Sequence, residues 1–315
     1  MESQEWPDPA DRSPAAITRR RFLKHTAWAG AAVAVAVGGG EIVSNVIGGG
    51  GDKNVDFTFA QISDSHLGFL GAANHDVTSS FSLAIAAVNA LPRRPDFVIH
   101  TGDLTHFSTP GQFDQAKQML SELKTGRVFT VPGEHDSIED GGSHYRTIFG
   151  AGSQGDGWYS FDLKGIHFLS LVNTVLLTKL GHLGQDQVDF VRRDLQGLKS
   201  DTPIVVFSHI PLTSVYTPWG WGTDDAMAVL TMMNRFSSVT CVNGHIHQLF
   251  TKTEGNASFH SARATAYPLP HPGDGPAPKP VTLPAGELGK ALGIRDVVHH
   301  VGTSALAIRD PRLTG

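Results

Sequence analysis

The chain has a single cysteine, Cys241, so it cannot form an internal disulfide bond. Its stability in an oxidising compartment would have to come from the hydrophobic core and from bound metals. Because Cys241 lies in an apolar run, we expect a buried core residue rather than a reactive thiol. Long basic runs are also absent and the formal net charge is −5, which argues against a dedicated nucleic-acid surface.

Charged residues are sparse, at 17 % of the chain, and no segment repeats at the period of a solenoid. Hydrophobic residues make up 40 % of the 315 residues, enough to bury a full core. The 35 glycines and 18 prolines indicate a globular protein rich in loops. Seven of the prolines fall within residues 268–284. Because proline fits neither a helix interior nor a central strand, we expect an extended surface loop there.

The N-terminal segment resembles a twin-arginine export signal. A basic run at residues 18–24, with three consecutive arginines, precedes an apolar stretch of alanine and valine at residues 26–37. That stretch is shorter than the roughly 20 residues that a membrane-spanning helix needs. We therefore expect export by the twin-arginine machinery to a periplasmic or extracytoplasmic location. Cleavage near Ala34–Ala36 and retention as a membrane tether are both compatible with the sequence, and residues 1–54 are assigned to the signal and its Gly-rich linker.

Five short polar motifs follow segments that are typical of buried β-strands. The motifs are Asp64-Ser65-His66, Gly102-Asp103, Gly133-Glu134-His135-Asp136, Ser208-His209 and Gly244-His245-Ile246-His247. The segments are residues 57–62, 96–100, 128–131, 203–207 and 239–242. The motifs would therefore gather at the carboxyl ends of neighbouring strands, where open α/β sheets bind ligands. Imidazole and carboxylate groups in this ratio favour Zn, Mn or Fe, and two such metals about 3.5–4 Å apart suit phosphoester hydrolysis.

Together the five motifs resemble the signature of the calcineurin-like metallophosphoesterases, over roughly residues 55–262. One position departs from the family pattern, because Glu134 stands where asparagine is usual. The resemblance implies an α/β sandwich of two mixed β-sheets flanked by helices, and hydrolysis of a phosphoester by a hydroxide that bridges two metals. Residues 55–267 are assigned to this domain, and residues 268–315 to the Pro-rich loop and a C-terminal extension packed on it.

The same resemblance implies a role for each ligand. One metal would be held by Asp64, His66 and His247. The second would be held by Glu134, His209 and His245, with Asp103 bridging both ions. A bridging carboxylate keeps two cations close while it damps their repulsion.

Roles other than metal ligation are expected for further residues in and near the motifs. His135 has no place among these ligands, so we expect it to steady the phosphoryl oxygens or to protonate the leaving group. Asp136 would orient that imidazole. His106 stands where purple acid phosphatases carry a metal-binding tyrosine, and direct ligation, substrate contact and a surface hydrogen bond are all compatible with this position. Trp219 and Trp221 would either form an apolar wall beside the metals or serve loop packing.

The rest of the sequence predicts an alternation of strands and helices. Helices are expected at residues 79–91, 111–123, 185–198 and 225–236. A strand pair is expected at residues 158–163 and 166–171, and strands of a second sheet at 249–253 and 258–262. Residues 296–308 would return as one or two edge strands.

The predicted function is hydrolysis of a small phosphoester. A phosphodiester is slightly preferred, because no basic cluster suited to a dianion lies beside the motifs, and the region resembles bacterial cyclic-nucleotide phosphodiesterases. Alternatives are a phosphomonoesterase, a lipid-headgroup phosphohydrolase, and a non-hydrolytic metal-binding or interaction module of the same fold.

Glu134 bears on the identity of the metals. With asparagine at this position, two divalent ions and two carboxylates would leave two positive charges, and an ionised Glu134 leaves one. A ferric ion beside a divalent ion would restore the balance, whereas two divalent ions suffice if Glu134 turns away or binds protonated. We therefore expect two metal ions, Fe, Mn or Zn, and hypothesise that iron occupies at least one position.

Overall fold

The computed structural model describes residues 34–37, 55–138 and 140–313. Val33–Gly315 form one compact unit. The predicted export signal lies outside the described residues, and Ala34–Val37 alone of its apolar stretch is described, as a β-strand. Export and cleavage therefore stay predictions. Among the described helices, none has the length and apolar content to cross a membrane.

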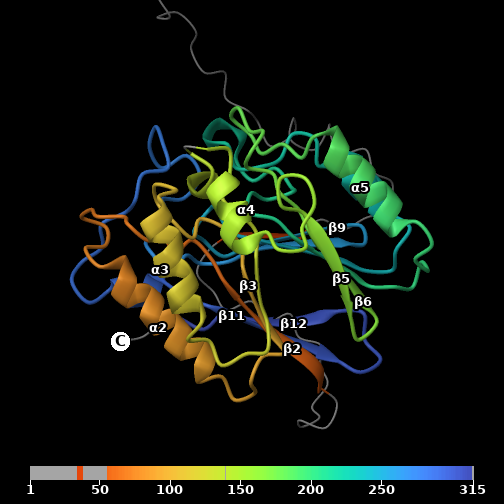
Figure 1. Cartoon of the computed structure of the whole chain (residues 1–315), viewed down its shortest axis with the longest axis horizontal. Coiled ribbons are helices and arrows are strands. Elements are labelled where there is room, and N and C mark those ends of the chain that lie inside the picture. The colour runs from red at the N-terminus through yellow and green to blue at the C-terminus, as the bar shows by residue number, and fades with distance from the viewer. Residues whose placement is uncertain (1–33, 38–54, 139, 314–315) are drawn as a thin grey trace, which may run out of the picture. The chain divides into compact units, whose positions relative to one another are not determined.

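The strands form two mixed sheets (Figure 1). One has the order β12-β11-β2-β3-β4, with β2, β3 and β4 parallel. The other has the order β1-β9-β10-β8-β7-β6-β5, with β6, β7, β8 and β10 parallel. The strands are β1 (Ala34–Val37), β2 (Val55–Ile62), β3 (Phe97–His100), β4 (Val128–Thr130), β5 (Tyr159–Leu163), β6 (Ile166–Ser170), β7 (Ile204–Phe207), β8 (Val239–Asn243), β9 (Phe250–Glu254), β10 (Ala257–Ser261), β11 (Arg295–His300) and β12 (Leu306–Arg309).

Aromatic residues fill the space between the two sheets. Phe59 of β2 and Phe97 of β3 contact Phe168 of β6 and Phe207 of β7, with ring centroids 5.5–6.4 Å apart. All four side chains are buried. Edge-on contacts of this kind add to the stabilisation that burial provides. This core fixes one sheet against the other, so the ends of their strands are held in a defined relation.

Helices cover the outer face of each sheet. Buried side chains of α2, α3 and α4 pack on the five-stranded sheet, and those of α5 and α6 pack on the seven-stranded sheet. Capping fixes where two of them begin, because the side chains of Asp76 and Thr109 accept from backbone N–H groups of the first turns of α2 and α3. The helices are α2 (Val77–Asn89), α3 (Pro110–Leu120), α4 (Ser143–Phe149), α5 (Gln185–Leu195), α6 (Met227–Met233) and α7 (Leu288–Ala291), with 3₁₀ turns η2 (Glu134–Asp136) and η3 (Thr217–Trp219).

The expected fold class, with two mixed sheets flanked by helices, is confirmed. Residues 268–284 contain neither helix nor strand, as expected. Two arrangements differ from the prediction. β9 and β10 share the seven-stranded sheet with β8, where β10 pairs with β8 and β9 pairs with β10. β11 is an interior strand that pairs with both β2 and β12. The helices α4 and α7 were not predicted, because at seven and four residues they are too short to show a periodic pattern.

Candidate metal centre

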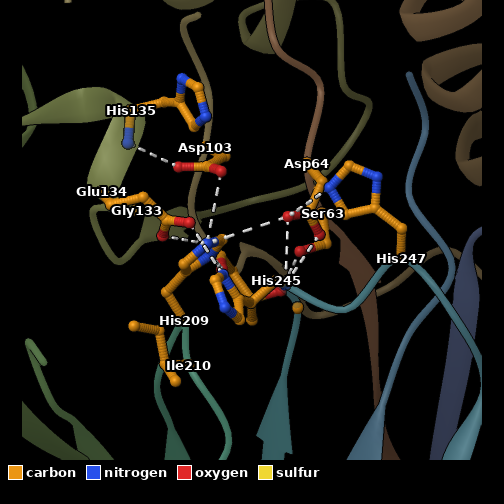
Figure 2. A network of polar contacts seen from close by, with 12 residues as sticks. Ser63, Asp64, Asp103, Gly133, Glu134, His135, His209, Ile210, His245 and His247 are labelled. Atoms are coloured by element: carbon orange, nitrogen blue, oxygen red, sulfur yellow. Dashed lines mark hydrogen bonds and ion pairs between the residues drawn. The ribbon is translucent and has the colours of Figure 1, made fainter. Parts of the chain in front are cut away.

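The five motifs meet at one edge of the sandwich, contributed by both sheets. β2, β3 and β4 are parallel neighbours in one sheet, and β7 and β8 are parallel neighbours in the other. The motifs follow the carboxyl ends of these strands, as predicted, but the strands are divided between two sheets instead of forming one. Figure 2 shows His209 in the middle of the resulting network, with contacts to Asp64, Asp103 and Glu134.

The chain turns sharply at the predicted ligands. Seven non-glycine residues have a left-handed backbone in the described part of the chain, and five of these are predicted ligands. They are Asp64 (φ 55°), His66 (43°), Asp103 (55°), His245 (69°) and His247 (53°). Such conformations are unfavourable for residues with a Cβ atom and tend to persist at functional sites.

The motif glycines allow the close approach of ligand side chains. A Cβ atom on Gly133 would lie 2.0 Å from Asp103 Oδ1, and a Cβ atom on Gly244 would lie 2.5 Å from Asp64 Oδ2. Both distances are far below van der Waals contact. Glycine is therefore required at these positions if the carboxylates are to stay where they are.

The first predicted ligand set is assembled with its metal-binding atoms facing one another. His247 Nε2 lies 3.3 Å from Asp64 Oδ1 and 3.3 Å from His66 Nε2. The other ring nitrogen of His247 donates to the carbonyl oxygen of Tyr267 at 2.6 Å. In the neutral ring, Nε2 of His247 therefore carries a lone pair. A lone pair directed at a carboxylate and a second imidazole is the arrangement that a cation between them would satisfy.

The second predicted ligand set has the same character. Glu134 lies 2.9 Å from His209 Nε2 through one oxygen and 2.9 Å from His245 Nδ1 through the other. His209 Nδ1 donates to the carbonyl oxygen of Thr101 at 2.7 Å, so its Nε2 faces the centre. Glu134 Oε2 and His209 Nε2 are both buried without a hydrogen bond of proper geometry. Unpartnered buried polar atoms are costly, and a metal ion would partner both.

Asp103 joins the two sets. Its Oδ2 lies 3.4 Å from His66 Nε2 and 3.4 Å from His209 Nε2, and its Oδ1 accepts from the backbone N–H of His135 at 2.9 Å. One carboxylate oxygen thus faces a ligand from each set. The donor atoms present therefore fit two adjacent transition-metal cations.

Electrostatics explain how buried charges coexist here. Burial alone would raise the pKa of Asp64, but the imidazoles of His247 and His209 lower it to about 2. Burial would likewise raise the pKa of Glu134, and the imidazoles of His245 and His209 hold it well below its usual range. Burial would lower the pKa of His209, but the carboxylates of Asp103 and Glu134 raise it well above its usual value. Asp64 and Glu134 are thus ionised, and they demand positive charge in this space.

His135 lies beside the centre, and its ring is held by a backbone group. His135 Nδ1 donates to the carbonyl oxygen of His106 at 2.8 Å, so this carbonyl, rather than Asp136, orients the ring. Asp136 instead accepts from the backbone N–H groups of Leu104, Thr105 and Gly133, at 2.8–3.1 Å. Asp136 therefore fastens the turn that follows β3 to the turn that contains Glu134.

The aromatic residue beside the predicted metal ligands is not one of those that the sequence suggested. Trp221 is 1 % exposed and packs with Ile246 and Phe250, and Trp219 lies edge-on against Trp221, so both serve loop packing. Tyr267 instead lies over the rings of His66 and His247, at 4.9 Å between centroids. No motif marks Tyr267, which is twenty residues beyond the ligand that its carbonyl group holds.

Comparisons with known proteins agree with this geometry. The family model for the calcineurin-like phosphoesterases matches residues 57–249. A 3',5'-cyclic-nucleotide phosphodiesterase of Nostoc sp. is 24% identical over 224 residues, which cover 69% of this chain and 81% of that protein. The glycerophosphodiester phosphodiesterase GpdQ of Enterobacter lignolyticus is 25% identical over 228 residues, which cover 67% of this chain and 78% of that protein. A dimetal phosphatase from Danio rerio has a similar fold, with a TM-score of 0.56 and 15% identity over 83% of this chain and 99% of that one. Because the family model spans more than half of its length, the chain belongs to the calcineurin-like phosphoesterase family.

Proposed function

We propose that the protein hydrolyses a small phosphodiester at a centre of two metal ions. The observation that carries this proposal is the position of Asp103, whose Oδ2 lies 3.4 Å from a nitrogen of each ligand set. A dinuclear centre needs such a shared oxygen. Export by the twin-arginine route is part of the proposal and rests on residues 18–24 alone.

The residues of the chain would divide the work between binding and proton transfer. Two cations held by the two ligand sets and Asp103 would supply Lewis-acid stabilisation of the phosphoryl oxygens and would lower the pKa of bound water. The ligand side chains are held by backbone carbonyls and tight turns, so they need little rearrangement during the reaction. His135 has Nδ1 committed to His106, which leaves Nε2 to donate a proton to the departing oxygen.

A phosphodiester is favoured over a phosphomonoester by charge. Three carboxylates, of Asp64, Asp103 and Glu134, lie in the centre, and no lysine or arginine is among the described side chains that contact them. A centre with so little net positive charge attracts a diester monoanion more readily than it stabilises a dianion. The phosphodiesterase names of two similar proteins support the same choice.

The test is hydrolysis of bis(p-nitrophenyl) phosphate by metal-loaded protein, compared with p-nitrophenyl phosphate. Activity should disappear on chelation, return when metal is restored, and be greater toward the diester. Inactivity toward both compounds with two metals bound per chain would contradict the proposal and favour a non-hydrolytic metal-binding module.

A further inference from the structure

Three predicted ligands turn Nε2 toward the centre, and the partners of their other nitrogens differ. His209 Nδ1 donates to the carbonyl oxygen of Thr101, and His247 Nδ1 donates to that of Tyr267. A carbonyl oxygen can only accept, so both rings carry a proton on Nδ1, and in the neutral form that binds a metal the lone pair is on Nε2. In these two cases the main chain sets the tautomer that a metal requires.

His66 is held differently, by a side chain. Its Nε2 faces Asp103 and His247, and its Nδ1 lies 3.2 Å from Nδ1 of His106. If His66 offers a lone pair to a metal through Nε2, its proton must sit on Nδ1. His106 Nδ1 then has to accept that proton in a hydrogen bond, with its own proton on Nε2.

His106 is itself well fixed. Its ring is stacked on the ring of His135, with centroids 4.6 Å apart and planes 15° apart, and Phe69 packs edge-on against it at 5.1 Å. Its carbonyl oxygen accepts from His135 Nδ1. His106 therefore contacts the predicted ligand His66 through its side chain and the predicted proton donor His135 through its backbone.

We propose that His106 is a positioning residue, which sets the tautomer and orientation of His66 and thereby the affinity of the metal held by Asp64, His66 and His247. His106 is not part of the ligand set of Asp64, His66 and His247, because its Nδ1 is directed at the far nitrogen of the His66 ring and not at the nitrogen that faces the centre. The inference rests on the proposed two-metal function, but it concerns metal binding and can be tested without a substrate.

Substitutions at position 106 can separate the hydrogen bond from the ring packing. In His106→Asn, Oδ1 stands where His Nδ1 stood and can accept from His66. His106→Leu has nearly the same shape as the asparagine variant but no acceptor. His106→Phe keeps a ring to stack on His135 and also lacks the acceptor. His75→Asn, at an exposed position on the loop after β2, is the matched control for loss of a histidine.

The measurement is titration of metal-free protein with Mn²⁺ and Co²⁺, which yields a dissociation constant for each metal. His106→Leu and His106→Phe should weaken one of the two sites by roughly 10–100-fold, while His106→Asn and His75→Asn stay close to wild type. At saturating Co²⁺ the d–d absorption intensity should be the same in all variants, because no ligand is lost. Thermal unfolding of each metal-free variant shows whether it has folded.

Several outcomes would overturn the inference. Equal affinity in the leucine and wild-type proteins would show that the hydrogen bond does not matter. Equal weakening in the asparagine and leucine variants would assign the effect to packing. A changed d–d intensity would make His106 a ligand. These results are distinct from failure of wild-type protein to bind two metals, which would instead refute the proposed function.

Discussion

At the scale of single residues, the centre is a set of carboxylates and imidazoles whose positions are fixed by hydrogen bonds to the backbone. Asp103 and His135 are adjacent within it, since the backbone N–H of His135 donates to Asp103 Oδ1. Their side chains nevertheless have different predicted roles. Asp103 is a bridging ligand, whereas the ring of His135 is available to the substrate.

Substitution of these two residues should separate metal binding from catalysis. His135→Ala should lower turnover of bis(p-nitrophenyl) phosphate by roughly 10²–10⁴-fold with metal content unchanged, because the backbone N–H that supports Asp103 remains. Asp103→Ala should empty or halve the metal site. Metal content is measured by elemental analysis and turnover by steady-state kinetics. Loss of metal from the His135 variant would overturn the division of roles.

Glu134 lies in the centre and not away from it, within 2.9 Å of both His209 and His245. Two divalent ions carry four positive charges, and the three carboxylates leave one of them uncompensated. A ferric ion in place of one divalent ion restores the two positive charges that asparagine at position 134 would leave. We therefore expect iron in at least one position of protein purified without added metal. Glu134→Asn removes one negative charge while keeping an oxygen ligand, and should shift the preference toward divalent metals. Elemental analysis that finds two zinc or manganese ions per chain and no iron would contradict this expectation.

At the scale of elements, the turns after the strands position the ligands. The turn from β4 into η2 passes so close to Asp103 that there is no space for a Cβ atom at Gly133. Gly133→Ala should displace the Asp103 carboxylate and weaken metal binding by roughly 10–100-fold. Gly111→Ala in α3, where a Cβ atom meets nothing within 4 Å, is the matched control. Similar metal affinity in both variants would show that the turn has more freedom than the structure indicates.

A second prediction at this scale concerns the junction of β5, β6 and α5. His167 donates to Asp162 at 2.9 Å and to Asp194 at 2.7 Å. Burial would lower the pKa of His167, but hydrogen bonds to these two carboxylates outweigh it and raise the pKa. The stabilisation is therefore fully present below the unfolded pKa of about 6.5, and it is lost as the pH rises through the raised folded pKa.

His167→Asn should consequently destabilise the protein more in mild acid than in mild base. The free energy of unfolding should fall by about 1–2 kcal/mol near pH 6 and by less near pH 9. This range counts little for the ion pair with Asp162, because the side chain of Asp162 is exposed to solvent. Urea unfolding at the two pH values measures the difference, and Asp194→Asn should reduce the same pH dependence. An equal loss at both pH values would mean that the charge of His167 does not contribute.

The sequence predicted the helices and strands of this fold better than it predicted which strands lie in the same sheet. Strand ends at Ile62, His100 and Phe207 were marked by apolar runs followed by polar motifs, so the ligands were identifiable. Periodicity does not encode which strands share a sheet, and the division of the motif strands between two sheets was therefore missed. For the same reason Tyr267, which supports a ligand through a contact distant in sequence, had no signal of its own, and His106 was a candidate whose role the sequence left open.

At the scale of the whole molecule, the centre links the two sheets. Asp64, His66, Asp103 and Glu134 follow strands of the five-stranded sheet, whereas the remaining ligands follow strands of the seven-stranded sheet. Without cations, three carboxylates share this space and rely on the nearby imidazoles for compensating charge. Bound metals would thus hold the sheets together as well as serve the reaction.

Removal of the metals should therefore lower the stability of the entire unit. Metal that binds only the folded state stabilises it by mass action, by about 2.7 kcal/mol per site when its free concentration is 100 times Kd. In a protein of this size, that corresponds to roughly 4–5 °C in Tm for each site. Calorimetry before and after chelation, and after metal is restored, measures the change. Asp103→Asn, which lacks the shared ligand charge, should respond much less to chelation. A wild-type Tm that is unchanged after metal has been removed would show that the sheets are held by their aromatic core alone.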